Sequence, residues 1–456
     1  MNTNKFQHIS TIPLDYSPSL ALTLFSPISE LPWSMLLRSA SKHHPDSRYD
    51  ILVTQPIATL VTRGEKTLIT HGNEAQESNR DPFALLQEIQ ESLLPNTDID
   101  IDLPFIGGAL GYFGYDLGRR VETIPNIATK DIDAPDMAMG IYEWAVVIDH
   151  LEQTACIVGN DIEKHHTWLL NLKETMQTRF ALSSQWQSNM SKADYTSKFN
   201  AVYRYLHSGD CYQINLAQRF CADYQGSIWQ AYQILEQANQ APFSAFIKLG
   251  NSAILSISPE RFLQIKGQNI ETKPIKGTRP RSNNPVKDME NAHDLVNTEK
   301  DQAENLMIVD LLRNDIGRVA KPGTVKVPRL FEVESFPAVH HLVSTVTAEL
   351  ATEYNVTDCL RACFPGGSIT GAPKVRAMEI IEELEPHRRS IYCGSIGYIS
   401  RSGQMDSSIT IRTLIATEQR LYAWAGGGLV ADSQVASEYQ ETLDKLSQIL
   451  PILTDY

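Results

Sequence analysis

Phe364-Pro-Gly-Gly-Ser-Ile-Thr-Gly-Ala-Pro-Lys-Val-Arg-Ala-Met378 is a glycine-rich loop that leads into a predicted helix. Pro373 suits the first turn of that helix, where free backbone N–H groups can bind a carboxylate or a phosphate. The loop is not a nucleotide-binding P-loop, because Ala372 and Pro373 stand where that motif requires lysine followed by serine or threonine. We therefore expect an anionic small molecule to bind at this point of the chain.

A lysine-containing turn lies upstream, in Thr272-Lys-Pro-Ile-Lys-Gly-Thr-Arg-Pro-Arg281. Pro274 fixes the backbone on one side of Lys276, and Gly277 permits an unusual backbone angle on the other. An amine held beside other cations, such as Arg279, tends to lose its proton, and neutral lysine is a nucleophile. A basic surface turn is the simpler interpretation of these residues alone, so other segments have to decide.

A helix is predicted from residue 298 to about residue 316, with Gly317 as its stop signal. Thr298 and Asp301 have the spacing of a capping box at its start. Glu304 shares a face with Asp301 on a stripe that is otherwise apolar, and a half-buried carboxylate needs a partner. The alternatives are a metal ion and a salt bridge to an arginine.

A last helix, predicted from about Ser437 onward, places Glu438, Glu441 and Lys445 together on one face. With Glu304, two helices would then each contribute carboxylates. Carboxylate oxygens suit Mg²⁺, a hard cation that keeps some waters and also binds substrate oxygens. Solvated helix faces explain such charges as well, so these residues alone do not establish a metal site.

Two further segments can line a cleft. Residues 405–415 alternate between apolar and polar as in a strand, with Arg412 in the polar set. Ala425-Gly-Gly-Gly-Leu-Val430 follows a predicted strand, and its glycines let backbone N–H groups approach a ligand closely. Glu260 follows a short predicted strand at residues 254–257, where a carboxylate often has only a structural part.

The composition is that of a globular enzyme: of 456 residues, 42% are hydrophobic and 21% charged. A formal net charge of −14 without an offsetting basic stripe argues against a nucleic acid partner. We expect no membrane association, because the N-terminus lacks an apolar signal segment and no run reaches eighteen apolar residues. The six cysteines include no C-x-x-C pair, which favours free thiols and a cytoplasmic location.

Seven ordered motifs together resemble the chorismate-utilising enzymes. They are P-I-K-G-T at 274–278, A-E-N-L-M-I-V-D-L-L-R-N-D-I-G-R at 303–318, H-H-L-V-S at 340–344, the loop at 364–378, I-T-I-R-T at 409–413, A-G-G-G at 425–428 and E-Y-Q-E-T at 438–442. Two tracts nearer the N-terminus, L-P-W-S-M-L-L-R-S at 31–39 and G-Y-F-G-Y-D-L-G-R-R at 111–120, point the same way. The resemblance covers nearly the whole chain.

The resemblance implies an α+β fold, in which two large antiparallel β-sheets pack together with helices outside and an active cleft between two lobes. A polar, aperiodic segment at residues 161–189 is the best candidate for the boundary between the lobes. We expect residues 1–180 to form the N-terminal lobe and residues 181–456 the chorismate-binding catalytic region. The two lobes should form one intertwined globular unit.

The resemblance also implies a role for individual residues. Lys276 and Glu260 match the catalytic nucleophile and the general acid and base, and Asp301 lies close to the expected metal. The Mg²⁺ ligands are matched by Glu304, Glu438 and Glu441. The substrate-binding positions are matched by His341, Ser368, Tyr392, Arg412, Gly426, Gly427, Gly428 and Lys445.

Within the family, the P-I-K-G-T turn is similar to that of the enzymes that make 4-amino-4-deoxychorismate from chorismate and ammonia. That reaction is a transferase step on the way to 4-aminobenzoate and folate. The resemblance implies that Lys276 forms a covalent intermediate with chorismate. Ammonia would come from glutamine through a separate amidotransferase subunit, component II. Gly209-Asp-Cys-Tyr-Gln213 lacks the final glycine of a nucleophile elbow, so the chain has no convincing glutaminase nucleophile of its own.

Two alternatives remain within the family. Anthranilate synthase component I has a similar turn, P-I-A-G-T, whose alanine cannot form the adduct, so ammonia attacks carbon 2 directly. Isochorismate and salicylate synthases use a lysine to activate water at the position that matches Gln213, and glutamine cannot act as that base.

A third alternative is a catalytically silent regulatory subunit that binds tryptophan. Part of a tryptophan pocket in anthranilate synthases is matched here, most clearly at Ser39 and in the Pro242-Phe-Ser segment. The complete set of matched positions is Ser39, Asp46, Ser47, Arg48, Tyr49, Pro242, Phe243 and Ser244. A silent homologue would be expected to lose some acid, lysine or metal positions, and none is missing in this sequence.

Overall fold

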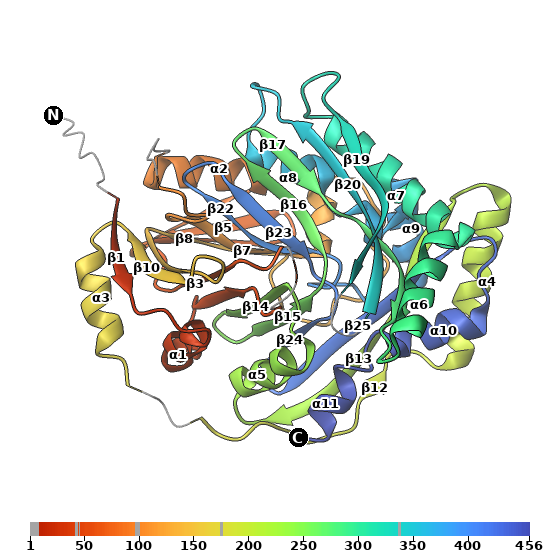
Figure 1. Cartoon of the computed structure of the whole chain (residues 1–456), viewed down its shortest axis with the longest axis horizontal. Helices are drawn as coiled ribbons and strands as arrows, with labels where there is room; N and C mark the ends of the chain where they lie inside the picture. Colours follow the sequence, from red (N-terminus) through yellow and green to blue (C-terminus); the bar gives the residue numbers. More distant parts are fainter. Residues whose placement is uncertain (1–8, 42–43, 45, 96–100, 174–176, 336–338) are drawn as a thin grey trace.

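The structure is a computed structural model that describes residues 9–41, 44, 46–95, 101–173, 177–335 and 339–456. Two large antiparallel sheets, one of 13 strands and one of 12, form the body of the molecule, and most helices lie around its outside (Figure 1). The expected α+β architecture is confirmed.

The first sheet carries the glycine-rich strand β25 near one end. Its strands, in spatial order, are β1 (Ser10–Leu14), β10 (Thr154–Gly159), β9 (Trp144–Asp149), β3 (Tyr49–Val53), β2 (Met35–Arg38), β14 (Phe243–Lys248), β15 (Ala253–Ser258), β24 (Thr413–Ala416), β25 (Arg420–Leu429), β13 (Gln213–Gln225) and β11 (Ala181–Leu182), with β12 (Gln187–Ser188) and β21 (Gly371–Ala372) also paired to β13.

The second sheet carries Lys276 on β18, at its edge. Its strands, in spatial order, are β18 (Ile275–Pro280), β20 (Val339–Glu349), β17 (Asn269–Thr272), β16 (Arg261–Lys266), β23 (Met405–Ile409), β22 (Ser395–Ser400), β7 (Gly108–Phe113), β8 (Met137–Tyr142), β4 (Ala58–Arg63), β5 (Lys66–His71) and β6 (Glu74–Ser78), with β19 (Lys326–Ser335) paired to β20.

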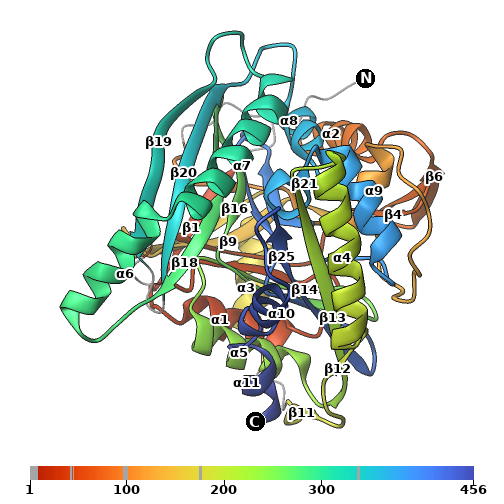
Figure 2. The same cartoon turned by 90° about the vertical axis from the view of Figure 1, so that its right-hand side faces the viewer.

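The helices cover the outer faces and edges of the two sheets (Figures 1 and 2). They are α1 (Leu20–Phe25), α2 (Pro82–Leu93), α3 (Ile162–Leu170), α4 (Lys192–Ser208), α5 (Ile228–Asn239), α6 (Pro285–Asn297), α7 (Glu299–Gly317), α8 (Val356–Cys363), α9 (Lys374–Leu384), α10 (Val435–Asp444) and α11 (Leu450–Thr454), with short 3-10 turns η1 (Ser26–Ile28), η2 (Tyr115–Arg120) and η3 (Gly367–Ile369). Within the described residues, no helix combines the length and the apolar character needed to cross a membrane.

The first sheet is buried on both faces. Ile254 and Leu255 are successive residues of β15, so their side chains point to opposite faces. Ile254 belongs to the large core that also contains residues of the second sheet, whereas Leu255 packs in a second core with Phe25 of α1 and Trp229 of α5. A strand that is buried on both sides carries apolar residues on both faces, as β15 does, although it also contains the buried Ser256 and Ser258.

Both sheets combine strands from the two halves of the chain. In the first sheet, β2 pairs with β14, and in the second sheet β7 pairs with β22. The lobe boundary expected near residue 180 stays a prediction, as does the cytoplasmic location.

The alternating segment at residues 405–415 is not one strand. It forms β23 in the second sheet and β24 in the first, and the chain crosses between the sheets at the residues that separate them. Arg412 lies at this crossing with φ of +50°, a backbone angle that ends regular strand geometry. Alternation predicted the two strands correctly but could not reveal the crossing.

Two predicted helix termini also differ. α7 ends at Gly317 as expected, but the Thr298 side chain caps no backbone N–H group of α7 and instead donates a hydrogen bond to the Asp294 carbonyl oxygen. The last helix is interrupted: α10 ends at Asp444 and α11 begins at Leu450. Pro451 occupies the first turn of α11, where a missing N–H group is tolerated.

Candidate active site

Ser368 links the predicted nucleophile to the predicted acid. The Lys276 Nζ atom, on β18, donates a hydrogen bond to the Ser368 carbonyl oxygen at 3.1 Å. The Ser368 Oγ atom, in η3, donates to Glu260 Oε1 at 2.9 Å. The lysine and the carboxyl group thus both contact the glycine-rich loop at residues 364–378, which lies far from them in the sequence.

Lys276 lies on strand β18, next to a β-bulge, and not in the turn that the sequence predicts. The register of β18 against β20 shifts between Lys276 and Thr278, and Gly277 has φ of +72°. A Cβ atom added to Gly277 would lie 2.7 Å from the Leu295 Cδ1 atom and 3.0 Å from the Asp301 carboxyl carbon. Both the backbone angle and the close packing therefore require glycine at this position.

Burial destabilises the charged forms of Lys276 and Glu260. It is the largest cause that lowers the pKa of Lys276, while Glu304 and Glu260 partly oppose it. It also raises the pKa of Glu260 to about 7, against the opposing effects of Lys276 and the Ser368 hydrogen bond. Burial thus favours the neutral amine at Lys276 and the protonated carboxyl group at Glu260.

The expected cause of the lysine shift was only partly right. Arg279 does not act on Lys276 as a free neighbouring cation, because it forms ion pairs with Asp294 at 2.6 Å and with Asp301 at 3.0 Å. The cation that does lower the pKa of Lys276 is Lys445, and its effect is smaller than that of burial. Asp301, expected close to the metal, is held by Arg279.

The three predicted metal ligands lie on two helices, Glu304 on α7 and Glu438 and Glu441 on α10. Burial is the largest cause that raises the pKa of Glu304 and of Glu438, and the neighbouring carboxylates raise both further. Burial would also raise the pKa of Glu441, but the Lys445 ammonium, 2.6 Å from its Oε1 atom, lowers it overall. The negative charges of Glu304 and Glu438 are thus not fully compensated by neighbouring cations.

This donor set fits a hard divalent cation. All three ligands would be carboxylates, which suit such an ion. Gly427 leaves room beside two of them, because an added Cβ atom would lie 3.1 Å from Glu438 Oε2 and 3.5 Å from Glu441 Oε1. In the described residues, the oxygens of these three carboxylates do not all lie within 4.8 Å of one another, whereas such a group does occur at His44, Asp46 and Glu334. Binding of an ion would have to draw the three side chains together.

The three glycines of β25 accommodate side chains of the neighbouring strand β13. Cβ atoms added to Gly426 and Gly428 would lie 2.4 Å from Asn215 Oδ1 and 2.3 Å from Gln213 Nε2. Both amide atoms of Gln213 and the Oδ1 atom of Asn215 are buried without a hydrogen-bond partner among the described residues. Such groups need a ligand or water, so Asn215 joins the candidate site although its sequence context gave no signal.

Lys445 connects α10 to β25. Its Nζ atom donates a hydrogen bond to the Gly426 carbonyl oxygen at 2.9 Å, in addition to its ion pair with Glu441. Lys445 therefore lies beside both the glycines and the carboxylates, as the sequence motifs required.

The remaining predicted binding residues are His341, Arg412 and Tyr392. Burial lowers the pKa of His341 to about 3, with Arg412 adding to the effect, so the imidazole is neutral; its Nδ1 atom lies 2.9 Å from Thr278 Oγ1. Burial lowers the pKa of Arg412, which has no ion pair within the described part of the chain. A buried guanidinium of this kind suits an anionic ligand. Tyr392 is buried and stacks on Trp424, with ring centroids 6.1 Å apart.

A separate pocket lies where the tryptophan-binding residues were expected. Ser39, Asp46, Tyr49 and the Pro242-Phe-Ser segment are among the residues that line it. Ser47 and Arg48 are not in the lining, and Arg48 forms an ion pair with Asp149 at 2.7 Å. Six of the eight matched positions thus surround one pocket.

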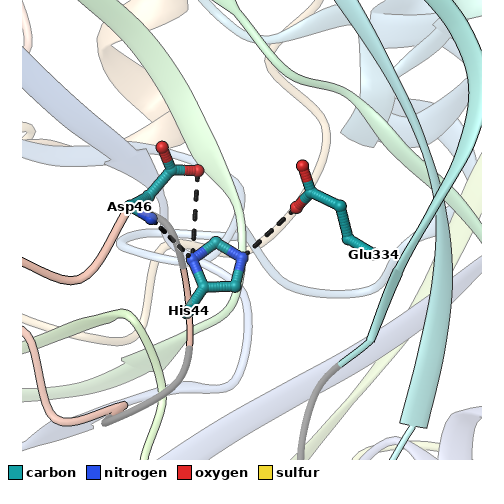
Figure 3. A group of neighbouring side chains, drawn as sticks. All are labelled: His44, Asp46 and Glu334. Carbon is teal, nitrogen blue, oxygen red and sulfur yellow. Dashed lines mark hydrogen bonds and ion pairs between the residues drawn. The ribbon is translucent and has the colours of Figure 1, made fainter.

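An ionic cluster adjoins this pocket. Figure 3 shows His44 between the carboxylates of Asp46 and Glu334, and the His44 Nε2 atom is 3.3 Å from Glu334 Oε2. Asp46 is also paired with Arg261 at 2.6 Å and with Lys273 at 3.1 Å. Because two cations already neutralise Asp46, we interpret the cluster as a structural ion-pair network and not as a metal site.

Residues 34–451 match the family of chorismate binding enzymes. The chain belongs to this family. All seven ordered motifs between residues 274 and 442 lie inside the matched range, and the range spans strands of both sheets.

Several members of the family are closely similar. Aminodeoxychorismate synthase component 1 of Salmonella typhimurium is 55% identical over 442 residues, which are 97% of this chain and 97% of that protein. The protein of the same name from Escherichia coli K12 is 55% identical over 442 residues, 97% of this chain and 98% of that protein. The crystal structure of anthranilate synthase component I from Streptococcus pneumoniae covers 88% of this chain and 92% of that chain, with a TM-score of 0.79 and 33% identity.

Proposed function

We propose that the chain is the chorismate-aminating component of an aminodeoxychorismate synthase, and that it converts chorismate and ammonia to 4-amino-4-deoxychorismate. The observation that carries the proposal is the connection from Lys276 through Ser368 to Glu260. The 55% identity to proteins named aminodeoxychorismate synthase component 1 supports it.

In the first displacement, the neutral amine of Lys276 attacks ring carbon 2 of chorismate. Both ring double bonds shift by one position and the 4-hydroxyl group leaves as water, taking a proton from Glu260. The pKa of Glu260, raised to about 7 mainly by burial, allows it to hold that proton near neutral pH. Lys276 is then bonded to the ring at carbon 2.

In the second displacement, ammonia that comes from solution or from a partner subunit attacks carbon 4. Both double bonds shift back, the bond between Lys276 and carbon 2 breaks, and the proton lost by the incoming nitrogen returns to Glu260. The sum is chorismate plus ammonia giving aminodeoxychorismate plus water. Two displacements of this kind place nitrogen where oxygen had been.

Glu304, Glu438 and Glu441 would hold Mg²⁺ in this scheme. The ion supplies electrostatic support by withdrawing negative charge through the ring carboxylate of the substrate. Arg412, which has no ion pair within the described residues, would bind the enolpyruvyl carboxylate together with Tyr392. His341, Ser368, Lys445 and the glycines of β25 would complete the ring pocket.

We further propose that glutamine is used only through a separate amidotransferase subunit. Cys211, the sequence candidate for a glutaminase nucleophile, is buried, and burial raises its pKa to about 11. A thiol of this kind is a poor nucleophile at neutral pH. Ammonium salts should therefore support turnover by the isolated chain, and glutamine should not.

Product identity tests the proposal against anthranilate synthesis. Aminodeoxychorismate keeps its pyruvyl group, whereas anthranilate formation releases pyruvate. Incubation of the purified chain with chorismate, ammonium and Mg²⁺ should give aminodeoxychorismate without pyruvate. Stoichiometric pyruvate together with anthranilate would reject the assignment.

The pocket at Ser39 and Phe243 is proposed to bind tryptophan as a structural ligand. Phe243 and Tyr49 supply aromatic surface for the indole ring, and Ser39 and Ser244 also line the pocket. This ligand would lie apart from the residues that react with chorismate.

A further inference from the structure

Lys300 joins the two helices that carry the predicted metal ligands. Its Nζ atom lies 3.9 Å from Glu304 Oε1 on α7 and 3.6 Å from Glu438 Oε1 on α10. The lysine side chain is 50% exposed, whereas those of Glu304 and Glu438 are 15% and 4% exposed. A cation that can reach solvent thus rests on two carboxylates that mostly cannot. Figure 2 shows α7 and α10 on the same side of the molecule.

Local helix energetics do not explain a lysine at this position. Lys300 is in the first turn of α7, where the helix dipole disfavours a cation. A lysine that precedes glutamate by four residues is also the weaker orientation of such a pair. The favourable contact that Lys300 makes at this position is its ion pair with Glu438, which lies on a helix far away in the sequence.

The other two lysines near the carboxylates are committed elsewhere. Lys276 donates a hydrogen bond to Ser368, and Lys445 pairs with Glu441 and donates to Gly426. Among the described residues, the ion-pair partners of Lys300 are Glu304 and Glu438. It is therefore the cation that can leave the site without breaking another contact.

We propose that Lys300 is the exchangeable counter-ion of the metal site: its ammonium group pairs with Glu304 and Glu438 while no divalent ion is bound, and it moves into solvent when the ion binds. The proposal rests on the proposed function in one respect, the use of these carboxylates for Mg²⁺. An ion that takes over the two carboxylates displaces a positive charge of the chain itself. Lys300 thus weakens metal binding and limits carboxylate repulsion in the metal-free protein.

Direct metal binding tests this. Mn²⁺ serves as the probe, because electron paramagnetic resonance measures its free concentration, and Mg²⁺ is added as competitor. Lys300→Met should bind Mn²⁺ about threefold to tenfold more tightly than the wild type, since a competing ion pair is removed. Lys300→Arg keeps the charge and should bind like the wild type.

Lys287→Met is the matched control. Lys287 lies on the neighbouring helix α6 and pairs with Glu290 at 3.6 Å, with both side chains 61% exposed. Its removal should leave Mn²⁺ affinity unchanged. Lys300→Gln provides a second neutral variant if Lys300→Met gives too little folded protein.

Unchanged or weaker Mn²⁺ binding in both neutral variants, with binding intact in the wild type, would overturn this proposal and leave the metal assignment standing. Absence of Mn²⁺ binding in the wild type and in every variant would reject the metal assignment and this proposal together. Binding in the neutral variants alone would support the proposal, because it would show that Lys300 blocks the site.

Discussion

Two buried groups of charged residues behave in opposite ways, one around Lys276 and Glu260 and the other around Asp46 and Arg261. Burial disfavours ionisation of the carboxyl groups in both. At Asp46, the cations of Arg261 and Lys273 outweigh burial and lower the pKa below its usual value. At Glu260, burial outweighs Lys276 and raises the pKa to about 7.

The difference separates a scaffold from a reactive site. In the Asp46 cluster every charge has a close partner, and its carboxylate is more stable ionised in the folded protein than in solution. Around Glu260 the charges are only partly compensated, so protons and ligands can still change the site. Perturbed groups of this second kind are typical of active sites. The variants below test the contrast, from the largest expected effect to the smallest.

Loss of a predicted metal ligand should have the largest effect. Glu304→Ala or Glu441→Ala is expected to lower turnover by about a thousandfold or more, because electrostatic support of the ring carboxylate is lost. Neither change should unfold the chain, since each removes one negative charge from a group of three. Rates with chorismate, ammonium and Mg²⁺ measure the effect, with Glu299→Ala on the same helix as control. Full activity of both variants in the presence of a chelator would refute the metal assignment.

Glu260→Gln should lower the rate by about 10²- to 10⁴-fold, the usual contribution of a general acid. In the wild type, the first displacement requires protonated Glu260, so its rate should fall as the pH rises through about 7. The variant should lack this limb of the profile. Single-turnover rates between pH 5.5 and 8.5 provide the measurement, and an unchanged limb in the variant would assign it to another group.

The same substitution should stabilise the fold at alkaline pH. The folded pKa of Glu260 lies above its ordinary value of 4.5, so the folded state binds more protons and loses stability as the pH rises from 4.5 to about 7. At pH 8, Glu260→Gln is expected to be more stable than the wild type by about 1–3 kcal/mol, with no difference near pH 4. Chemical denaturation at the two pH values measures this. Equal stability at pH 8 would show that ionised Glu260 is not strained.

Asp46→Asn should have the opposite profile. Removing the carboxylate takes one close partner from Arg261 and from Lys273, which keep Asp406 at 3.0 Å and Glu334 at 3.6 Å, and should cost about 1–3 kcal/mol of stability at pH 7. Because the folded pKa of Asp46 is lowered, this loss should shrink as the pH falls below about 4. Turnover should change by less than about threefold, and a much larger loss would show that the cluster acts in catalysis.

Tryptophan should have the smallest effect. At about ten times its dissociation constant, it should raise the melting temperature by about 1–3 °C, and D-tryptophan serves as the control ligand. Phe243→Ala should reduce the shift, because the ring lines the pocket. An equal shift with both enantiomers and in the variant would exclude binding at this pocket.

Local signals in the sequence predicted the parts of the site that depend on local backbone geometry. Gly277 and Pro274 indicated an unusual backbone beside Lys276, because proline restricts the backbone angles and glycine permits a positive φ. The helix position of Glu304 followed from periodicity in the same way. The roles of these residues came only with the family motifs.

Long-range contacts were not visible in the sequence. Asp46 and Arg261 are 215 residues apart, and their ion pair depends on how the sheets pack. Lys300 precedes Glu304 by four residues and looks like an ordinary surface pair; its contact with Glu438 requires the position of α10. The crossing near Arg412 was missed because an alternating pattern does not record which sheet a strand joins.

The central claim is that Lys276 is a nucleophile, and trapping its adduct tests this most directly. Chorismate is mixed with the enzyme and Mg²⁺ without ammonia, the mixture is quenched, and the peptides are analysed by mass spectrometry. The account predicts added mass on Lys276 in the wild type and none in Lys276→Arg, whose guanidinium stays protonated. The account would be contradicted if no adduct formed under single-turnover conditions and Lys276→Ala still made aminodeoxychorismate at the normal rate.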